Sequence, residues 1–190
     1  MPLHFDKMFS KCFGVIFLIV YHDFNISVEE YENRSKKNDF PTVEQCPHCK
    51  SRVRLFRHGF YWRNAIDEKQ HRIPILRLKC PSCRNTLSVL PTFLLSYFQY
   101  TADVILEKLR DILIDHNIGN YHQLVLFYRK RFLNRLNQIE MFFRDDGFKG
   151  TLPKDPKEKA TKLLRMILAL GKATFLRRYR GHFSYNFMAH

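Results

Sequence analysis

Two pairs of cysteines constrain the fold of this chain more than any other feature of its sequence. The motifs CPHC, from Cys46 to Cys49, and CPSC, from Cys80 to Cys83, each place two thiols on one tight turn of the backbone. This spacing lets both sulfurs of a pair approach one tetrahedral metal ion at roughly 2.3 Å. The sequence therefore predicts one structural zinc ion, bound by Cys46, Cys49, Cys80 and Cys83.

Disulfides or unpaired buried thiols are the alternatives to a zinc site. Both would require two CxxC pairs to arise by chance in a chain with five cysteines. The fifth, Cys12, lies beside an apolar run and is interpreted as a small buried hydrophobe. His48, His58 and His71 could also bind a metal, but four thiolates complete a tetrahedron. We therefore expect these three histidines on the surface.

The distribution of charge predicts a polyanionic partner. The chain has 32 Lys and Arg against 18 Asp and Glu, a formal net charge of +14, and a pI near 9.8. Residues 46–84 hold ten basic and two acidic residues, whereas residues 1–45 are slightly acidic. Zinc with four thiolates contributes −2, which leaves about +6 on the cysteine-bearing segment. We expect nucleic acid, rather than a membrane, to meet this charge.

The apolar run from Phe13 to Tyr21 could be mistaken for a targeting or membrane segment. It is too short to span a bilayer, and no small-residue cleavage pattern follows it. Its Val, Ile and Phe content favours a buried β-strand. Paired thiols suit a reducing compartment, so we expect the protein in the cytoplasm.

The remaining pattern predicts an α+β fold in four parts. Residues 1–44 supply a strand and a helix that pack on a ribbon, and residues 45–92 form this small antiparallel four-cysteine zinc ribbon. Residues 93–146 form a helical region, and residues 147–190 form a linker and a C-terminal helix. Apolar alternation predicts ribbon strands over residues 52–63, 72–79 and 86–91, and Gly59 indicates a bulge in the first of them. Three- and four-residue spacing and capping residues predict helices over residues 27–38, 101–114, 121–144 and 155–180.

Residues 103–131 have the order of a helix-turn-helix, with a short glycine-containing turn between two helices. In that interpretation the start of the second helix reaches base edges through Tyr121, His122 and Gln123. Its later basic residues would then contact phosphates, namely Arg129, Lys130 and Arg131. An ordinary helical hairpin with a solvated basic face explains the same pattern, and both interpretations stay open.

The ribbon strands offer a second basic surface, in which cations alternate with Phe56, Phe60, Tyr61 and Trp62. Arginines beside flat aromatic rings suit phosphates and unstacked bases. The alternative is that the rings fill a small interior while the charges only maintain solubility. We expect the cluster as a whole to bind nucleic acid through Arg52, Arg54, Arg57, Arg63, Arg72, Arg77 and Lys79.

The motifs CPHC, RLKCPSC, TLSVLPTFLLSYFQYT and FYRKRF together resemble a family of zinc-ribbon proteins associated with bacterial insertion sequences. Some of its members are classed as transposases and others only as a domain of unknown function. The resemblance covers roughly residues 31–132, and it implies a DNA-binding head that recognises element ends. A cutting transposase needs three metal-binding carboxylates on a mixed sheet, whereas the residues after Cys83 look helical throughout.

Other catalytic motifs are also missing from the sequence. It contains no Gly-x-Ser-x-Gly elbow, no phosphate-binding P-loop and no His-x-Glu motif before the cysteines, and four thiolates leave zinc no open position. We therefore expect a zinc-dependent DNA-binding protein of mobile-element origin that has no catalytic activity of its own. The alternative is a protein-interaction module or dimerising adaptor that binds a transposase or other nucleic-acid machinery. Duplex DNA is the expected ligand, with single-stranded nucleic acid or RNA as a weaker alternative.

Overall fold

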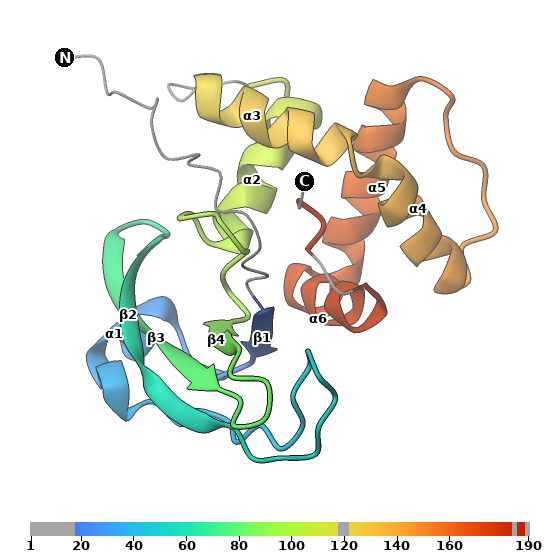
Figure 1. Ribbon diagram of the computed structural model, residues 1–190. Helices are drawn as coiled ribbons and strands as arrows, with labels where there is room; N and C mark the ends of the chain where they lie inside the picture. Colours follow the sequence, from blue (N-terminus) through green and yellow to red (C-terminus); the bar gives the residue numbers. More distant parts are fainter. Residues whose placement is uncertain (1–17, 118–121, 184–185, 189–190) are drawn as a thin grey trace.

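The computed structural model describes residues 18–117, 122–183 and 186–188, which form an α+β fold with a mixed four-stranded sheet (Figure 1). The first half contains β1 (Leu18–His22), α1 (Val28–Arg34), the 3-10 turn η1 (Ser35–Lys37), β2 (Phe56–Ile66), β3 (Gln70–Lys79) and β4 (Thr86–Pro91). The described part of the second half contains α2 (Ala102–Leu113), α3 (His122–Leu133), α4 (Leu136–Asp145), α5 (Pro156–Leu170) and α6 (Lys172–His182). Among these helices, none combines the length and the apolar content needed to cross a lipid bilayer.

The sheet has the strand order β1-β4-β3-β2. The expected antiparallel ribbon is present as β2, β3 and β4, and β1 joins it parallel to β4, so that the sheet is mixed. Strand β3 lies between β4 and β2. Its run from Ile73 to Leu76 is accordingly fully or almost fully buried. Strands β1 and β2 therefore form the two edges. The outer side of β2 is bridged at its end, where Ile66 pairs with Tyr100, and has no other strand partner within the described residues.

A bulge in β2 decides which of its side chains share a face. The pairing slips between Arg57, which lies opposite Leu78, and Gly59, which lies opposite Arg77. Gly59 has φ of 131°, a conformation that other residues rarely adopt, so the predicted bulge is confirmed. Arg57 and Phe60 are three residues apart, so regular alternation would place their side chains on opposite faces of the sheet. The extra residue of the bulge places both side chains on one face.

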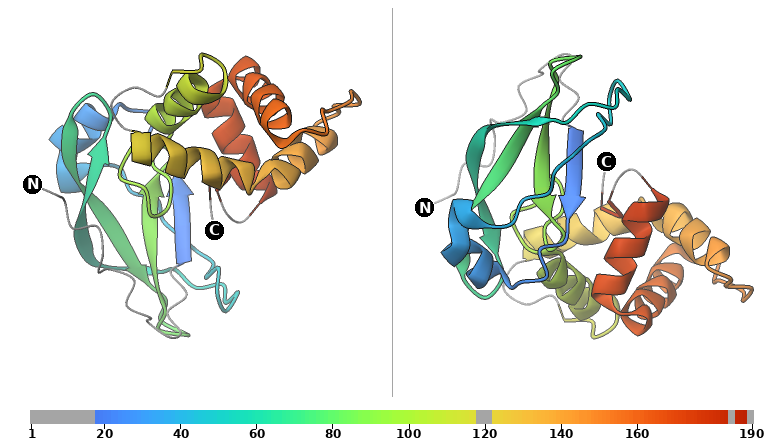
Figure 2. Two further views of the ribbon diagram at one scale, coloured as in Figure 1. Left: turned by 90° about the horizontal axis from the view of Figure 1, so that it is seen from above. Right: turned by 90° about the horizontal axis from the view of Figure 1, so that it is seen from below.

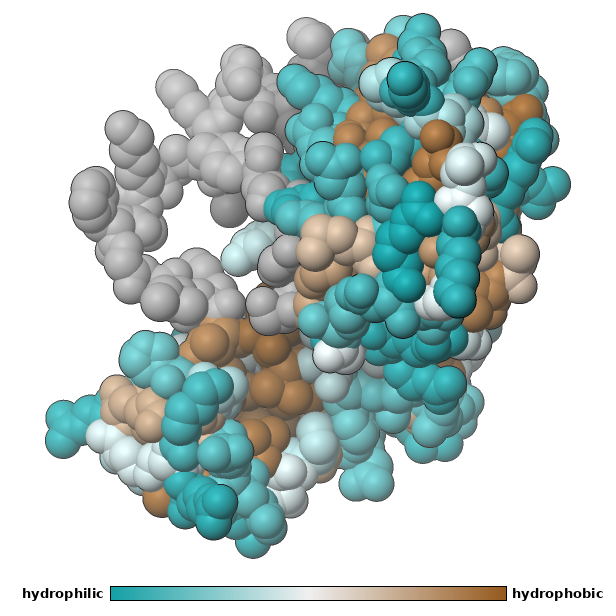
Figure 3. Space-filling view, turned by 90° about the vertical axis from the view of Figure 1, so that its right-hand side faces the viewer, coloured by the Kyte–Doolittle hydropathy of each residue, from teal (hydrophilic) through white to brown (hydrophobic). Residues whose placement is uncertain are grey.

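The interior consists of two apolar clusters. One lies between the sheet, α1 and the cysteine turns, and the other lies among α2 to α6. Figures 1 and 2 show the sheet with α1 and the helices α2 to α6 as two lobes. Figure 3 shows one face of the molecule, on which hydrophobic residues gather in a patch beside hydrophilic ones. The connecting segment contributes to both clusters, since Leu94 packs in the first and Leu95 in the second.

Helix α6 attaches the helical lobe to the sheet through Arg180. Its guanidinium donates hydrogen bonds to the carbonyl oxygens of Thr92 (2.8 Å) and Leu94 (2.9 Å), and it stacks 4.0 Å from the ring centroid of Tyr21. Burial lowers the pKa of Arg180. This half-buried cation therefore links the two lobes through its hydrogen bonds to backbone carbonyl oxygens.

Three predicted elements differ in their bounds. The first ribbon strand begins at Phe56 rather than at residue 52, and it continues to Ile66. The predicted helix over residues 121–144 is two helices, because Arg135 leaves the helical conformation and α4 begins after it. The predicted C-terminal helix is likewise divided, because Gly171 adopts φ of 89° and ends α5.

The prediction that His71 lies on the surface is wrong. Its ring is buried where β3 begins, with Nδ1 2.7 Å from Glu32 Oε2 and Nε2 3.1 Å from Asp67 Oδ1. Burial alone would lower the pKa of His71, but the hydrogen bonds and charges of the two carboxylates outweigh it and raise that pKa. The same contacts anchor α1, which carries Glu32, to the start of β3.

We predict that His71→Gln destabilises the protein most in mildly acidic solution. The pKa of His71 is raised on folding, so its charged interactions contribute fully below the unfolded value of about 6.5 and fade as pH rises through the folded value. The substitution should lower the free energy of unfolding by about 1–2 kcal/mol near pH 6 and by less in alkaline solution. Urea unfolding of both proteins at each pH measures this difference.

Glu29→Gln is a matched control, because Glu29 lies on the same helix but makes only an exposed pair with Lys69 at 3.5 Å. Its effect should stay within about 0.5 kcal/mol at every pH. An equal loss of stability for His71→Gln at both pH values would contradict the proposed charge state.

Candidate metal centre and basic face

The two cysteine turns adopt the same backbone structure. In the first, Cys46 N–H donates to Ser51 O (3.0 Å) and Lys50 N–H donates to Cys46 O (2.9 Å). In the second, the corresponding bonds run from Cys80 to Asn85 and from Arg84 to Cys80, both at 3.0 Å. The residue after each second cysteine has positive φ, namely 61° for Lys50 and 60° for Arg84. This repeated turn directs both sulfurs of each pair to one side.

The four sulfurs meet in one cluster, and all lie within 4.8 Å of one another. Cys46 Sγ is 3.7 Å from Cys83 Sγ, and Cys49 Sγ is 3.8 Å from Cys80 Sγ, so each close contact joins the two turns. None of the four cysteines forms a disulfide. Ligands at ~2.3 Å in a tetrahedron are about 3.8 Å apart, so the cluster can hold a metal ion.

The pKa values of the two thiols of the second turn are shifted in opposite directions. The backbone N–H of Cys83, assisted by that of Ser82, lowers the pKa of the Cys80 thiol to about 7. The backbone N–H of Asn85 would lower the pKa of the Cys83 thiol, but desolvation and hydrogen bonds with the neighbouring sulfurs outweigh it and raise that pKa to about 11. Cys46 and Cys80 are buried within the apolar cluster of the sheet, whereas Cys49 is exposed. The centre thus lies at the margin of the core, where one turn precedes β2 and the other joins β3 to β4. His48 and His58 are exposed, as predicted, and neither belongs to the cluster.

The structure separates the predicted nucleic-acid residues of the ribbon into three groups. Arg52, Arg54, Arg57 and Arg72 are exposed. Arg77 and Lys79 are half-buried on the opposite face of the sheet, where Arg77 donates to Thr86 Oγ1 (3.3 Å).

The third group is Arg63, which turns inward from β2. Its guanidinium donates to the carbonyl oxygens of Leu95 (2.8 Å) and Phe98 (2.5 Å), and burial lowers its pKa. Like Arg180, it holds the segment between the lobes. Its charge is therefore not part of the exposed basic surface.

One face of β2 and β3 combines the exposed cations with aromatic rings. Trp62 is 46% exposed, and its ring centroid lies 5.8 Å from Arg72 Cζ and 5.9 Å from Lys36 Nζ. The same Lys36 nitrogen lies 5.8 Å from the centroid of Phe60. We call Arg72, Trp62, Lys36, Phe60 and Arg57 the aromatic strip. Sequence analysis missed Lys36, because it lies in η1 and only folding brings it to β2.

The predicted helix-turn-helix residues form a less coherent surface. Tyr121 lies outside the described residues, while His122, Gln123 and Lys130 are exposed and Arg129 is half-buried. Arg131 donates to Met188 O (3.3 Å) and lies 5.0 Å from the ring centroid of Phe127. Residues 114–117 follow α2 and belong to no helix, and the described part of α3 begins at His122. These four residues alone already have the length of the whole turn in a helix-turn-helix. The geometry therefore favours the aromatic strip over α3 as the candidate interface.

We predict that Cys80→Ser abolishes metal binding and unfolds the sheet. Structural zinc contributes about 10–16 kcal/mol to small sites, as much as the whole stability of an ordinary domain. Elemental analysis should find one zinc ion per chain before the change and far less after it, and circular dichroism should lose strand signal. Cys12→Ser, which removes the cysteine outside the described residues, should keep both. An unchanged spectrum for Cys80→Ser, or a protein that purifies without metal, would contradict a structural zinc ion.

Comparison with known proteins groups the metal centre and the adjoining strands in one sequence unit. Residues 46–123 match a family model described as "Domain of unknown function (DUF6431)". The match begins at Cys46, includes all four clustered cysteines, and covers less than half of the chain. No curated protein sequence and no solved structure matches the chain. The matched unit contains β2, β3, β4 and α2, so the cysteine cluster and the β2 and β3 residues of the strip belong to it.

Proposed function

We propose that this protein binds DNA through the aromatic strip, and that a single structural zinc ion folds the ribbon that presents it. The observation that carries the proposal is the exposed Trp62 between the cations Arg72 and Lys36. A large exposed ring between two cations has little value for folding, because half of its apolar surface remains in water. Such rings and cations do suit stacked bases and phosphates.

The charges around the strip support a polyanionic ligand. Arg54, Arg57 and Arg72 are exposed, and no salt bridge engages them within the described residues. Lys50 and Arg84 add exposed cations on the two cysteine turns. Each cation that neutralises a phosphate releases a counterion, so the affinity of this surface should fall steeply with salt.

We propose a structural role for the zinc ion and no catalytic step for the chain. Four thiolates would occupy all positions of a tetrahedral ion, so no water would be bound for chemistry. Because the sequence resembles zinc-ribbon proteins of insertion sequences, we further propose that the protein originates from a mobile element. It would bind DNA while a separate protein cuts it. The exposed His122, Gln123 and Lys130 on α3 are proposed as a secondary contact with duplex DNA.

A protein-interaction module is the second candidate, and the free edge of β2 favours it. Strand β2 is the last strand of the sheet order, and from Phe56 to Ala65 its outer side has no strand partner within the described residues. An edge of this length can pair with a strand of another chain. Light scattering and retention on immobilised DNA distinguish the candidates, because a stable protein complex without DNA retention would favour the interaction module.

We predict that binding of duplex DNA quenches the fluorescence of Trp62, the single tryptophan of the chain. Trp62→Ala should weaken binding severalfold, since the ring holds the cations of Arg72 and Lys36 at the surface through cation–π contacts, which contribute about 0.5–1 kcal/mol each at exposed sites. Tyr97→Ala is the matched control, because Tyr97 is 80% exposed but lies outside the strip, and it should change affinity little. Fluorescence anisotropy with a labelled duplex measures both variants.

We also predict that this affinity decreases by at least tenfold between ~50 and ~200 mM salt. Titrations of the zinc-loaded protein at several salt concentrations give the slope. Affinity no greater than that of a neutral control protein at the lower salt concentration, or equal affinity at both concentrations, would overturn the proposed function.

A further inference from the structure

A cavity of about 350 Å³ lies at one end of the aromatic strip, between the segment after η1 and the start of β2. Its lining combines two cations with an apolar and aromatic surface and contains no carboxylate. The lining residues are Phe40, Pro41, Thr42, Arg54, Leu55, Phe56, Arg57 and Leu78. This volume lies within the ~300–1,000 Å³ range of small-ligand sites.

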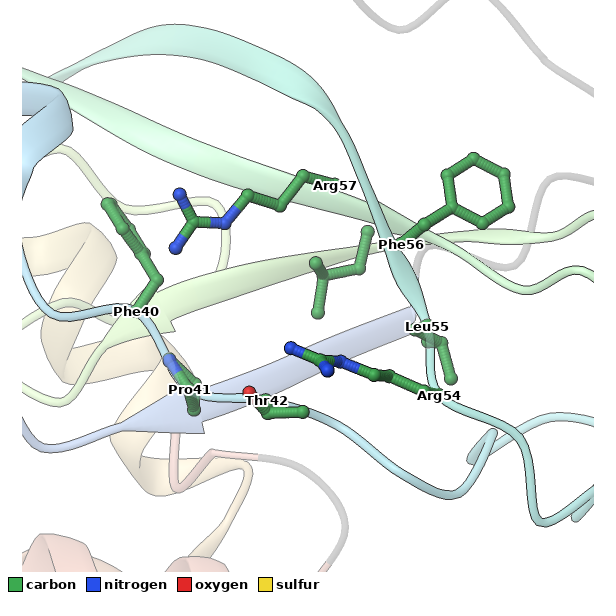
Figure 4. A pocket seen from close by; sticks show the side chains of 8 residues that line it. Phe40, Pro41, Thr42, Arg54, Leu55, Phe56 and Arg57 are labelled. Carbon is green, nitrogen blue, oxygen red and sulfur yellow. The ribbon is translucent and has the colours of Figure 1, made fainter.

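The two arginines are directed to the same side of the cavity. Figure 4 shows the side chains of Arg54 and Arg57 extending towards the Phe40 to Thr42 segment, whereas the Phe56 ring points away. Neither guanidinium has a hydrogen bond or ion pair with another described residue. Two nearby cations without an anionic partner repel each other, and a bound phosphate would relieve that repulsion.

The cavity is continuous with the aromatic strip. The ring of Phe40 meets the ring of Phe60 edge to face, with centroids 5.4 Å apart. Arg57 belongs to both, because the bulge at Gly59 places it on the face that also carries Phe60. A nucleic-acid strand that follows the strip would therefore reach the cavity at Arg57.

The apolar part of the lining identifies what such a strand would place there. Phe40, Leu55 and Leu78 are core residues whose outer edges form the apolar floor of the cavity. The backbone of a duplex presents phosphates and sugars and keeps its bases stacked, so it would leave this apolar floor uncovered. An unpaired nucleotide carries both a phosphate for the arginines and a flat base for the apolar lining.

We propose that this cavity is a subsite for one unpaired nucleotide, with its phosphate between Arg54 and Arg57 and its base against Phe40, Leu55 and Leu78. This inference rests on the proposed function and makes it more specific. The preferred ligand is DNA in which a duplex adjoins a single-stranded overhang. The duplex lies along the aromatic strip, and the first unpaired nucleotide enters the cavity.

The experiment compares a labelled blunt duplex with the same duplex carrying a short overhang, by fluorescence anisotropy of the zinc-loaded protein. The native protein should bind the overhang duplex about tenfold more tightly. The double substitution Arg54→Gln and Arg57→Gln should remove this preference. Thr42→Trp should also remove it, because the added ring fills the cavity while both arginine charges remain.

The matched control is Arg165→Gln with Arg177→Gln, which removes two exposed charges from α5 and α6. It should keep the preference for the overhang. Zinc content and circular dichroism establish that each variant is folded before its binding is compared.

Equal binding of both ligands by the native protein would overturn the nucleotide subsite and leave the proposed function standing. Persistence of the preference in Thr42→Trp would also overturn the subsite, because charge alone would then explain the preference. Failure to bind either DNA would instead overturn the proposed function, and the subsite with it.

Discussion

The contact between the two cysteine turns determines how the rest of the ribbon is arranged. One turn precedes β2 and the other joins β3 to β4, so a metal ion bound between them would tie three strands together at one end of the sheet. Residues 38–55 contain no helix or strand, and Leu55 N–H bonds to Val43 O within this segment. A chain this irregular depends on a cross-link to stay ordered. The positions of Arg52 and Arg54 therefore depend on the cysteine cluster, although neither residue belongs to it.

A second constraint, the bulge at Gly59, determines what the metal-supported ribbon presents. Without the extra residue, strict alternation would place Arg57 and Phe60 on opposite faces. With it, the strip extends from Trp62 through Phe60 to Arg57 on a single face, beside α1 and η1. A glycine accommodates the positive φ that this requires. A metal ion at the cysteine cluster would thus stabilise the ribbon, and one backbone irregularity directs the ribbon's cations.

The difference between local and long-range information explains what could be predicted from the sequence. Each cysteine turn, strand β4 and the start of α5 depend on residues close together in the chain, and all are as predicted. The meeting of the two turns is a long-range contact, and it was predicted because one metal ion needs both cysteine pairs. The burial of His71 and the place of Lys36 depend on α1 and η1 packing against β3 and β2. No periodicity within either segment indicates that contact. The cavity likewise could not be predicted from the sequence, because its walls come from two separate segments, the loop after η1 and the start of β2.

The basic residues of the chain have more than one structural role. Arg63 from the sheet and Arg180 from α6 both donate to carbonyl oxygens of residues 92–98, the segment between the lobes. Hydrogen bonds from charged donors contribute about 1.5–3 kcal/mol each, so these cations stabilise the junction. Both guanidinium groups are half-buried and already engaged with these carbonyl oxygens, and Arg131 likewise donates to Met188 O. The proposed binding of DNA therefore rests on where the exposed cations lie, around Trp62 and the cysteine turns, rather than on the total of +14.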